Sequence, residues 1–278
     1  MIPIISVIIP CFNSETTLES TLESVLNQEF QHWEAIIVND GSTDTTEEIG
    51  LRWVKKDKRF KYFAKQNEGL GKTRNYGIAK SNGIYILPLD SDNQLIKDFV
   101  SSAIPIFEKD SNIGVVHGNA EYFGEKSGLW IMDSYNLEKI LVENYIDACT
   151  IYKKKMWEQV GGYDENMPFQ GHEDWDFWIA LGILNVRFYH LEKTTFKYFV
   201  SKKSMIRNFT DKMHEANNNY IFIKYSREYQ IKFKTLYYVN QLDKKESLEI
   251  LKSKKFVIDL FFSTFFRFSV FGYFKVKK

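Results

Sequence analysis

The segment GIYILPLDSDN, residues 83–93, runs as an apolar stretch and then ends in two carboxylates, Asp90 and Asp92. An apolar run of this length is typical of a strand that is buried on both faces of a sheet. The two acids therefore come where such a strand reaches the surface. By themselves they fit three interpretations: solvated acids at a strand end, a nucleophile pair of the phosphatase type, or a site for a divalent cation and its phosphates.

Three earlier segments have the same strand character. They are IISVIIP at 4–10, WEAIIVND at 33–40 and KYFAKQ at 61–66. The segments 13–28 and 41–56 place apolar residues at helical spacing, and so does 72–81 before the fourth strand. This alternation predicts an α/β fold with a mostly parallel sheet and flanking helices on both of its faces.

Polar clusters follow three of the predicted strands. They are CFNSE at 11–15, NDGSTD at 39–44 and DSDN at 90–93. In the first cluster, Asn13 or Ser14 is expected to cap the helix that follows. Because ligands bind beyond the carboxyl ends of the strands in open parallel sheets, we expect the three clusters to line one crevice.

The pattern is less regular after residue 113. It predicts a strand at 113–124, a strand or hairpin within 147–155, and helices within 156–165 and 171–184. Neither an internal repeat nor a low-complexity linker interrupts the chain. We therefore expect the second part to continue the same α/β domain.

The C-terminal part is basic and aromatic. Residues 201–278 hold 17 Lys and Arg against 7 Asp and Glu, a net charge of +10, whereas residues 1–200 carry −9. Such a split fits a tail that meets an anionic surface, or one that is rich in lysine for solubility. The stretch 255–274 predicts an aromatic helix with one narrow polar stripe. An interfacial helix, or a helix packed on the preceding domain, fits this pattern better than a transmembrane span.

The two cysteines, Cys11 and Cys149, are too few for a disulfide framework, so we expect free and buried thiols. The first ten residues contain neither a basic leader nor a cleavage site with small residues. We therefore expect a cytoplasmic protein. It would attach peripherally to the inner face of the cell membrane if residues 255–274 dock there.

Five longer segments carry more information together than any one motif. In chain order they are VIIPCFNSETTLESTLESVLNQ, AIIVNDGSTDTT, GLGKTRNYGIAKSNGIYILPLDSDN, VGGYDE and HEDWDFW. They resemble the landmarks of family 2 glycosyltransferases over roughly residues 3–200. The resemblance implies the A-type glycosyltransferase fold, a nucleotide-sugar donor and an inverting transfer. It divides the chain into a catalytic domain at 1–204, with a nucleotide-sugar-binding half (1–112) and an acceptor half (113–204), and a helical extension at 205–278.

The resemblance places the nucleotide-sugar at the strand ends. Asp40 matches the aspartate that accepts the N–H of uracil, and Phe12 is positioned to stack on the base or the ribose. Arg74 matches the residue that steadies the nucleotide or the diphosphate, with Lys72 as a helper. The other expected donor contacts are Pro10, Asn13, Glu15, Asp90 and Ser91.

Asp90 and Asp92 match the metal motif of the family. Hard carboxylate oxygens suit Mg²⁺ or Mn²⁺, which also binds phosphates and acts as a Lewis acid. The resemblance makes Asp92 the direct ligand and Asp90 a contact of the ribose or of a metal-bound water.

The expected third metal ligand is missing from the sequence. Many relatives supply a histidine in a Tyr-Arg-x-His segment, but here Phe199 replaces the arginine and Ser201 the histidine. His190 and His214 are substitutes, although each also fits a structural role. Lys202 and Lys203 are alternatives for holding the diphosphate.

The HEDWDFW segment supplies the remaining chemistry. An inverting transfer needs a base that takes the proton of the acceptor hydroxyl. Asp174 matches the position of this base, with Glu173 as the alternate, and Asp176 fits a helix N-terminal acid. Trp175 and Trp178 fit either sugar stacking or core packing. His172 fits a loop residue better than a ligand.

We therefore expect a metal-dependent hexosyltransferase that uses a UDP-sugar, rather than a GDP- or dTDP-sugar, to extend a glycan or lipid-linked acceptor of a cell-surface polysaccharide or lipo-oligosaccharide. No nucleic-acid partner is expected. One alternative is a non-catalytic nucleotide-sugar-binding or scaffold domain, which the altered YFVS segment favours. A strand-end phosphatase is another, but its acid pair normally ends the first strand. A nucleotidyltransferase would open with a basic, Gly-rich loop, which PCFNSE does not provide.

Overall fold

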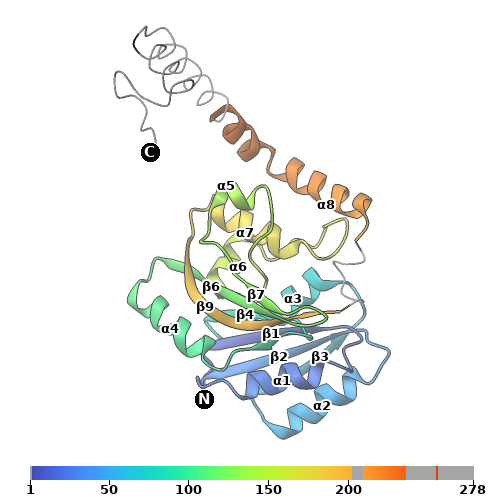
Figure 1. Cartoon of the computed structure of the whole chain (residues 1–278). Coiled ribbons are helices and arrows are strands. Elements are labelled where there is room, and N and C mark those ends of the chain that lie inside the picture. The colour runs from blue at the N-terminus through green and yellow to red at the C-terminus, as the bar shows by residue number, and fades with distance from the viewer. Residues whose placement is uncertain (1, 202–208, 236–254, 256–278) are drawn as a thin grey trace, which may run out of the picture. The chain divides into compact units, whose positions relative to one another are not determined.

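A computed structural model of the chain describes residues 2–201, 209–235 and 255. The chain divides into two compact units, residues 1–221 and residues 222–278. Within the described part, nine strands form one sheet with the order β3-β2-β1-β4-β8-β6-β9-β5, and β7 pairs with β6 (Figure 1). The predicted α/β architecture with flanking helices is confirmed.

The first part of the sheet is parallel and regular. Strand β1 pairs in parallel with β2 and β4, and β2 pairs in parallel with β3. The strands and the helices between them are β1 (Ile5–Cys11), α1 (Leu18–Leu26), β2 (Trp33–Asp40), α2 (Thr46–Lys56), β3 (Phe60–Lys65), α3 (Leu70–Ala79) and β4 (Tyr85–Pro88). Each of these elements overlaps a segment that the sequence predicts.

Both faces of this part of the sheet are covered because alternate strand residues meet different helices. Val7 and Ile9 of β1 belong to the buried cluster that includes Leu22 of α1. On the opposite face, α3 lies so close that a Cβ added at Gly77 would lie 2.7 Å from Ile8 Cγ2. Figure 1 shows α1 and α2 on one side of the sheet and α3 on the other.

The second part of the sheet is mixed. Strand β8 is antiparallel to β4 and β6, and β6 runs parallel to β9 with register shifts along the pair. The elements are β5 (Gln94–Leu95), α4 (Phe99–Lys109), β6 (Ile113–Gly124), β7 (Gly128–Trp130), α5 (Leu137–Ile140), β8 (Ile151–Lys153), α6 (Lys154–Val160), α7 (Glu173–Ile183) and β9 (Arg187–Val200). Strand β9 and helix α4 are additions to the predicted elements, and α4 contains Pro105, a residue type that argues against a helix interior.

The first compact unit includes the start of helix α8 (Asp211–Lys224). Asn217 is fully buried; its side-chain oxygen accepts the backbone N–H of Phe169 at 2.9 Å, and its Nδ2 donates to the backbone oxygen of the same residue at 2.8 Å. The Tyr220 hydroxyl donates to Asp164 at 3.0 Å. These bonds extend the first unit beyond residue 204, whereas the expected division into two halves at residue 112 stays a prediction.

The second unit is described only in part. Helix α8 ends at Lys224, and residues 226–235 are also helical, as expected for this region. Apart from Lys255, the predicted amphipathic stretch at 255–274 lies outside the described residues. No helix in the described part of the chain is long and apolar enough to cross a membrane.

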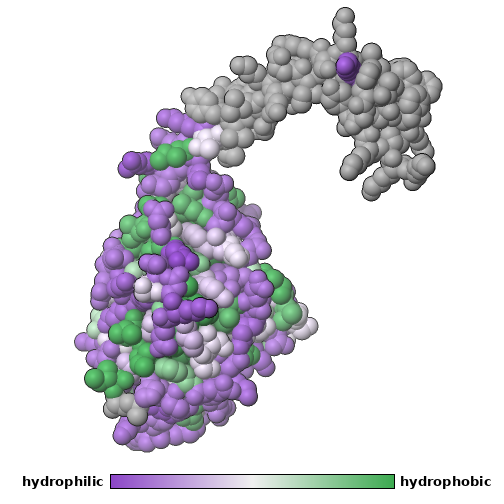
Figure 2. All heavy atoms as spheres, turned by 90° about the vertical axis from the view of Figure 1, so that its left-hand side faces the viewer, coloured by the Kyte–Doolittle hydropathy of each residue, from purple (hydrophilic) through white to green (hydrophobic). Residues whose placement is uncertain are grey.

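One face of the first unit is mainly polar. Figure 2 shows one face on which hydrophilic atoms predominate and small hydrophobic patches are separated from one another.

Cys11 and Cys149 are free and buried, as the sequence predicts. Burial raises the pKa of the Cys11 thiol, so this thiol is held in its neutral form.

Candidate active site

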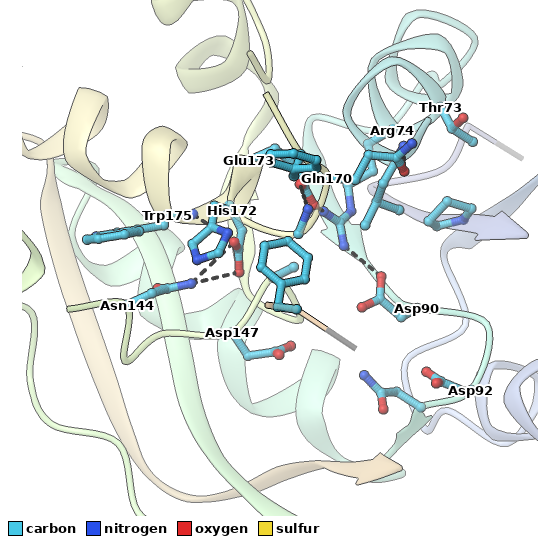
Figure 3. A pocket seen from close by; sticks show the side chains of 18 of the residues that line it. Thr73, Arg74, Asp90, Asp92, Asn144, Asp147, Gln170, His172, Glu173 and Trp175 are labelled. Carbon is cyan, nitrogen blue, oxygen red and sulfur yellow. Dashed lines mark hydrogen bonds and ion pairs between the residues drawn. The ribbon is translucent and has the colours of Figure 1, made fainter. Parts of the chain in front are cut away.

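A cavity of about 1160 Å³ lies beyond the carboxyl ends of β1, β2 and β4. This is the crevice that the polar clusters predict. Of the expected site residues, those lining it are Pro10, Phe12, Asp40, Arg74, Asp90, Ser91, Asp92, Glu173 and Asp174. Figure 3 shows that the labelled carboxylates, from elements far apart in the chain, are directed toward one space.

Arg74, on α3, forms ion pairs with one carboxylate after β4 and one carboxylate on α7. Its guanidinium is buried and donates to Asp90 at 2.6 Å through Nη2 and to Glu173 through Nη1 (Figure 3). Burial lowers the pKa of Arg74, but the two carboxylates outweigh this and raise it well above its usual value. Glu173 is also buried, and its second oxygen accepts the backbone N–H of Gly171 at 2.7 Å. Both oxygens of the alternate base are therefore engaged.

Asp40, at the end of β2, holds the loop before α3. One of its oxygens accepts Lys65 Nζ at 2.5 Å and the backbone N–H of Glu68 at 3.0 Å. The other accepts the backbone N–H of Gly69 at 2.9 Å. Because a carboxylate oxygen can accept two hydrogen bonds, the second oxygen keeps one acceptor site for a ligand N–H.

The remaining expected donor contacts differ in position. Phe12 is 52% exposed at the edge of the cavity, which leaves its ring available for stacking. Ser91 lines the cavity, and its hydroxyl bonds that of Ser14 at 2.7 Å. The loop of residues 11–15 therefore contacts the loop that carries the two aspartates.

Asn13, Glu15 and Lys72 lie outside the cavity lining. The Asn13 side chain accepts the backbone N–H of Thr43 at 2.9 Å, and Glu15 accepts the Thr45 hydroxyl at 2.9 Å. These bonds join the loops after β1 and β2. Lys72 Nζ lies 3.8 Å from Glu68 and is 41% exposed.

The expected cap of the first helix is wrong. Helix α1 begins at Leu18 with Thr17 as its N-cap residue. Ser14 contributes a backbone oxygen, which accepts the N–H of Leu18 at 2.9 Å, rather than a capping side chain. Asn13 adopts the left-handed region with φ of 50°, so that a turn separates β1 from the helix.

Asp92 and Asp90 both line the cavity and are half-buried. Burial, together with the charge of Asp90, raises the pKa of the Asp92 carboxyl to about 7. No basic side chain pairs with Asp92 among the described residues. Two neighbouring carboxylates, of which Asp92 has no basic partner among the described residues, suit a hard divalent cation. However, no group of three His, Cys, Asp or Glu in the described part of the chain is arranged to hold one.

The histidines do not complete such a group. His190 bonds Asn119 at 3.0 Å and stacks on His117 outside the cavity lining. His214 lines the cavity with its ring edge toward His172. His172 Nδ1 lies 2.9 Å from Asn217 Nδ2, and burial lowers the pKa of its ring, so it acts as a structural residue.

The first turn of α7 places Asp174 in the cavity. Asn144 Nδ2 lies 3.2 Å from both carboxylate oxygens, and the N–H of Trp175 donates to one of them at 2.7 Å. Burial, then the charge of Glu173, raises the pKa of the Asp174 carboxyl to about 7. Such a group exchanges its proton near neutral pH.

The other residues of this segment pack the helix. The indole N–H of Trp175 donates to the backbone oxygen of Ile140, and that of Trp178 to Ile146 at 3.1 Å. Trp178 is fully buried, so core packing is its role, whereas Trp175 also lines the cavity. Asp176 is buried in the first turn of α7, at the helix start where an acid is expected.

Two polar cavity residues close to Asp174 are among those that the sequence does not single out. Asn144 and Asp147 come from the segment between α5 and β8, which has no regular structure and no recognisable motif. Burial, then the negative charge of Asp90, raises the pKa of Asp147 well above its usual range. Only the fold brings these residues close to Asp174, which accepts hydrogen bonds from Asn144 and whose charge acts on Asp147; Figure 3 shows Asn144 and Asp147 at the site.

The family model "Glycosyl transferase family 2" matches residues 6–169 of this chain. The chain belongs to glycosyltransferase family 2. It is 32% identical over 186 residues to an uncharacterized glycosyltransferase of Rickettsia bellii, covering 66% of this chain and 27% of that protein. It is 29% identical over 234 residues to glycosyltransferase GlyA of Streptococcus pneumoniae, covering 76% and 33%.

Solved structures share the A-type glycosyltransferase fold with this chain. S. aureus TarS 1-349 in complex with UDP-GlcNAc superposes with a TM-score of 0.64 at 21% identity, covering 76% of this chain and 64% of that one. The mannosyltransferase PcManGT from Pyrobaculum calidifontis, in complex with GDP-Man and Mn²⁺, gives a TM-score of 0.57 at 16% identity, covering 73% and 58%. The chain spans 27% and 33% of the two curated relatives described above.

Proposed function

We propose that the chain is an inverting glycosyltransferase that moves a sugar from a nucleotide-diphosphate sugar, specifically a UDP-sugar, to a glycan or lipid-linked acceptor. One observation carries the proposal: Asp174, with a pKa near 7, shares a cavity with Arg74 and the aspartates that follow β4. A base and an anion-directed cation at one site are what an inverting transfer from a nucleotide-sugar requires.

The donor would lie across the strand ends. Phe12 would stack on the base or ribose, and Asp40 would accept the base N–H through its remaining acceptor site. Arg74 would steady the donor at its diphosphate end, beside Asp90. The UDP-bound and UDP-GlcNAc-bound complexes of TarS support a UDP-sugar, although these structures are 24% and 21% identical to this chain.

Asp92 and Asp90 would hold a divalent cation, Mn²⁺ or Mg²⁺. Their two carboxylates face the cavity while Asp92 has no basic partner among the described residues, so the chemistry of this pair fits the ion. The bound cation would supply Lewis-acid stabilisation of the charge that develops on the leaving diphosphate. Donor phosphates and water would complete its coordination.

Asp174 would act as the base. The acceptor oxygen forms a bond to the anomeric carbon while the bond from that carbon to the diphosphate oxygen breaks, and the acceptor proton passes to Asp174. Asn144 would fix the orientation of the carboxylate by bonding both of its oxygens. Glu173, which pairs with Arg74, would position that arginine rather than take the proton.

A second candidate is a non-catalytic nucleotide-sugar-binding domain. The absence of a three-ligand metal group from the described residues favours it, as does Ser201 at the position of the expected histidine. We propose the enzyme because a binding domain has no need for a buried acid with a raised pKa beside Asn144.

The cellular role is also a proposal. We place the reaction in cell-surface polysaccharide or lipo-oligosaccharide biosynthesis in the cytoplasm, with peripheral attachment to the inner face of the membrane through residues 255–274. Liposome flotation of the full chain against a truncation at residue 254 tests the attachment, and equal flotation would contradict it.

A panel of UDP-, GDP- and dTDP-sugars tests the donor and the metal. Hydrolysis of a UDP-sugar in the presence of Mn²⁺ or Mg²⁺, and its loss on chelation, is the expected result. Asp92→Asn should raise the Mn²⁺ concentration needed for half-maximal rate. Full activity in chelator would overturn the role of Asp92, and activity only with a GDP- or dTDP-sugar would overturn the donor.

A further inference from the structure

Three aromatic side chains lie together on one face of neighbouring strands in the second part of the sheet. Tyr122 of β6 pairs in register with Tyr198 of β9. Trp130 of β7 lies diagonally across from Tyr122 on the neighbouring strand. Because side chains alternate between the two faces of a strand, all three point the same way. The Trp130 ring centroid lies 5.8 Å from that of Tyr122, with parallel planes, and 5.5 Å from that of Tyr198, edge on.

This aromatic cluster, defined as Tyr122, Trp130 and Tyr198, forms part of the cavity wall. Trp130 and Tyr198 line the same cavity as Asp174. Burial and the charges of Asp147, Asp90, Asp92 and Asp174 all raise the pKa of Tyr198, which places this ring close to the acids. Trp130 and Tyr198 are both half-buried.

The cluster lies away from the base-binding end. In the sheet, Phe12 and Asp40 follow β1 and β2, Asp90 and Asp92 follow β4, and β8 with β6 come next. Strand β7 pairs with β6. Strand β9 pairs with β5, where Gln94 is the partner of Lys197, so Tyr198 lies close to the loop that carries Asp90 and Asp92. The cluster is therefore separated from Phe12 and Asp40 by β4 and β8 and lies beside the aspartates, where the donor sugar and the acceptor would meet.

Polar side chains share the cavity with the aromatic cluster. Asn144, Asp147 and Asp174 provide amide and carboxyl groups to the same cavity. A ligand that contacts both sets of side chains has one apolar face and a rim of hydroxyl groups, which describes a sugar ring. Aromatic rings stack on apolar faces, and Trp and Tyr add a polar group at the edge.

The charge of the cavity opposes other acceptors. Its described lining residues include seven carboxylates, against the single guanidinium of Arg74. In the proposed function Arg74 is engaged by the donor diphosphate, so a phosphate monoester on the acceptor would have no cation among the described lining residues to pair with. An acyl chain would remove water from the acids without replacing their hydrogen bonds. A neutral sugar avoids both costs.

We propose that Trp130 and Tyr198, backed by Tyr122, are a stacking platform for the sugar ring of the acceptor. The acceptor is then a neutral saccharide, and its nucleophile is a ring hydroxyl presented to Asp174. This inference rests on the proposed function and deepens it, because it chooses the sugar of a glycan over a phosphate or a lipid chain as the group held at the site.

Direct binding tests the platform independently of catalysis. Saturation-transfer NMR with the full chain, UDP and Mn²⁺ would use the methyl β-glycosides of glucose, galactose and N-acetylglucosamine as probes. We expect at least one glycoside to bind the wild-type chain. Trp130→Ala should weaken its affinity by about tenfold or more, since a tenfold change corresponds to about 1.4 kcal/mol. Trp130→Phe should recover part of the loss because it keeps an aromatic face.

A matched control is available on the same strand. Leu129 is 61% exposed and points to the opposite face of β7 from Trp130. Leu129→Ala should leave glycoside binding at the wild-type level, and thermal unfolding would verify that each variant is folded. Where a glycoside also serves as acceptor, Trp130→Ala should raise its KM more than it lowers kcat.

The possible results separate the two proposals. Binding of no glycoside by the wild-type chain, or equal binding by Trp130→Ala and Leu129→Ala, would overturn the platform even if UDP-sugar hydrolysis is intact. Tighter binding of inorganic phosphate or of a short-chain alkyl phosphate than of any glycoside would also overturn it. Glycoside binding that depends on Trp130, without hydrolysis of any nucleotide-sugar, would support the platform and contradict the catalytic proposal.

Discussion

The segments that we propose as a nucleotide half (residues 1–112) and an acceptor half (residues 113–204) are built in different ways. In the first, parallel strands alternate with helices, and α1, α2 and α3 each follow a strand directly. In the second, β6 and β9 are long, their pairing contains register shifts, and cavity residues come from an irregular segment between α5 and β8. The first half therefore depends on local sequence periodicity, and the second on contacts between distant segments.

Arg74 joins the two halves. It lies on α3 of the nucleotide half and binds both Asp90 of that half and Glu173 of the acceptor half. This arginine links the helix that carries Asp174, the proposed base, to the aspartates after β4 within one cavity. Three kinds of substitution test this comparison. One removes the proposed base in the acceptor half, one removes Arg74 between the halves, and one alters the packing of α3 in the nucleotide half.

The largest expected effect is on the acceptor half. Asp174→Asn removes the proposed base, and we expect transfer and donor hydrolysis to fall by about 10²- to 10⁴-fold, the usual contribution of a general base. Rates are measured with the best UDP-sugar, and UDP binding by calorimetry. Asp133→Asn is the control, because this exposed acid pairs with Lys139 outside the cavity. Unchanged rates in Asp174→Asn together with normal UDP binding would favour the non-catalytic binding domain.

A change at the junction should act on stability. Arg74→Met leaves Glu173 and Asp90 buried or half-buried without their cation, and losing one partner of a buried pair costs about 3–5 kcal/mol. Urea unfolding measures the free energy of unfolding. Arg52→Met is the matched control, because Arg52 and Glu19 are exposed and such pairs contribute about 0–1 kcal/mol. Equal losses in the two variants would show that Arg74 does not hold the halves together.

A packing change tests the nucleotide half. A methyl group added by Gly77→Ala would lie 2.7 Å from Ile8 and 3.1 Å from Val38, so α3 must move away from the sheet. Overpacking of this kind costs about 1–3 kcal/mol. Glu23→Ala on the exposed face of α1 should stay within about 0.5 kcal/mol of the wild type in the same unfolding experiment. A neutral Gly77→Ala would mean that the contact between α3 and the sheet is looser than described.

The smallest expected effect is a shift in pH dependence. Asp174 acts as a base only when ionised, so transfer should rise with pH and reach half of its maximum near pH 7. Asn144 lowers the pKa of Asp174. Its removal in Asn144→Ala should therefore move the rise to higher pH by about 0.7 unit, the equivalent of about 1 kcal/mol for one hydrogen bond. Profiles of kcat for both proteins measure this, and an unshifted profile counts against the role of Asn144.

The raised pKa of Asp174 also determines the direction in which this group changes the free energy of unfolding as the pH rises. Between about pH 4, where an unfolded aspartate titrates, and pH 7, the folded chain binds more protons than the unfolded chain does. The contribution of this group to stability is therefore lost as the pH rises through that range. Unfolding of Asp174→Asn should show a smaller loss of stability with rising pH than the wild type.

The sequence predicts the nucleotide half well because its signals are local. IISVIIP and WEAIIVND become β1 and β2, buried on both faces, and the polar clusters after them meet at one edge. The misplaced cap at Asn13 and Ser14 is a boundary error, since the turn at φ of 50° comes from contacts with the loop at Thr43. The helix at Pro105 was missed because tertiary packing of α4 overrides its local propensity.

The sequence by itself determined the α/β alternation, the position of Asp90 and Asp92 at a strand end, and the family to which HEDWDFW belongs. Only the tertiary structure decided that Arg74 is shared between Asp90 and Glu173, that Asn144 and Asp147 stand beside Asp174, and that Trp130 and Tyr198 share one wall. The physical reason is sequence separation. Periodicity and strand-end polarity repeat within a few residues. The contacts named above join positions more distant in the sequence, which only the folded sheet and its register bring together.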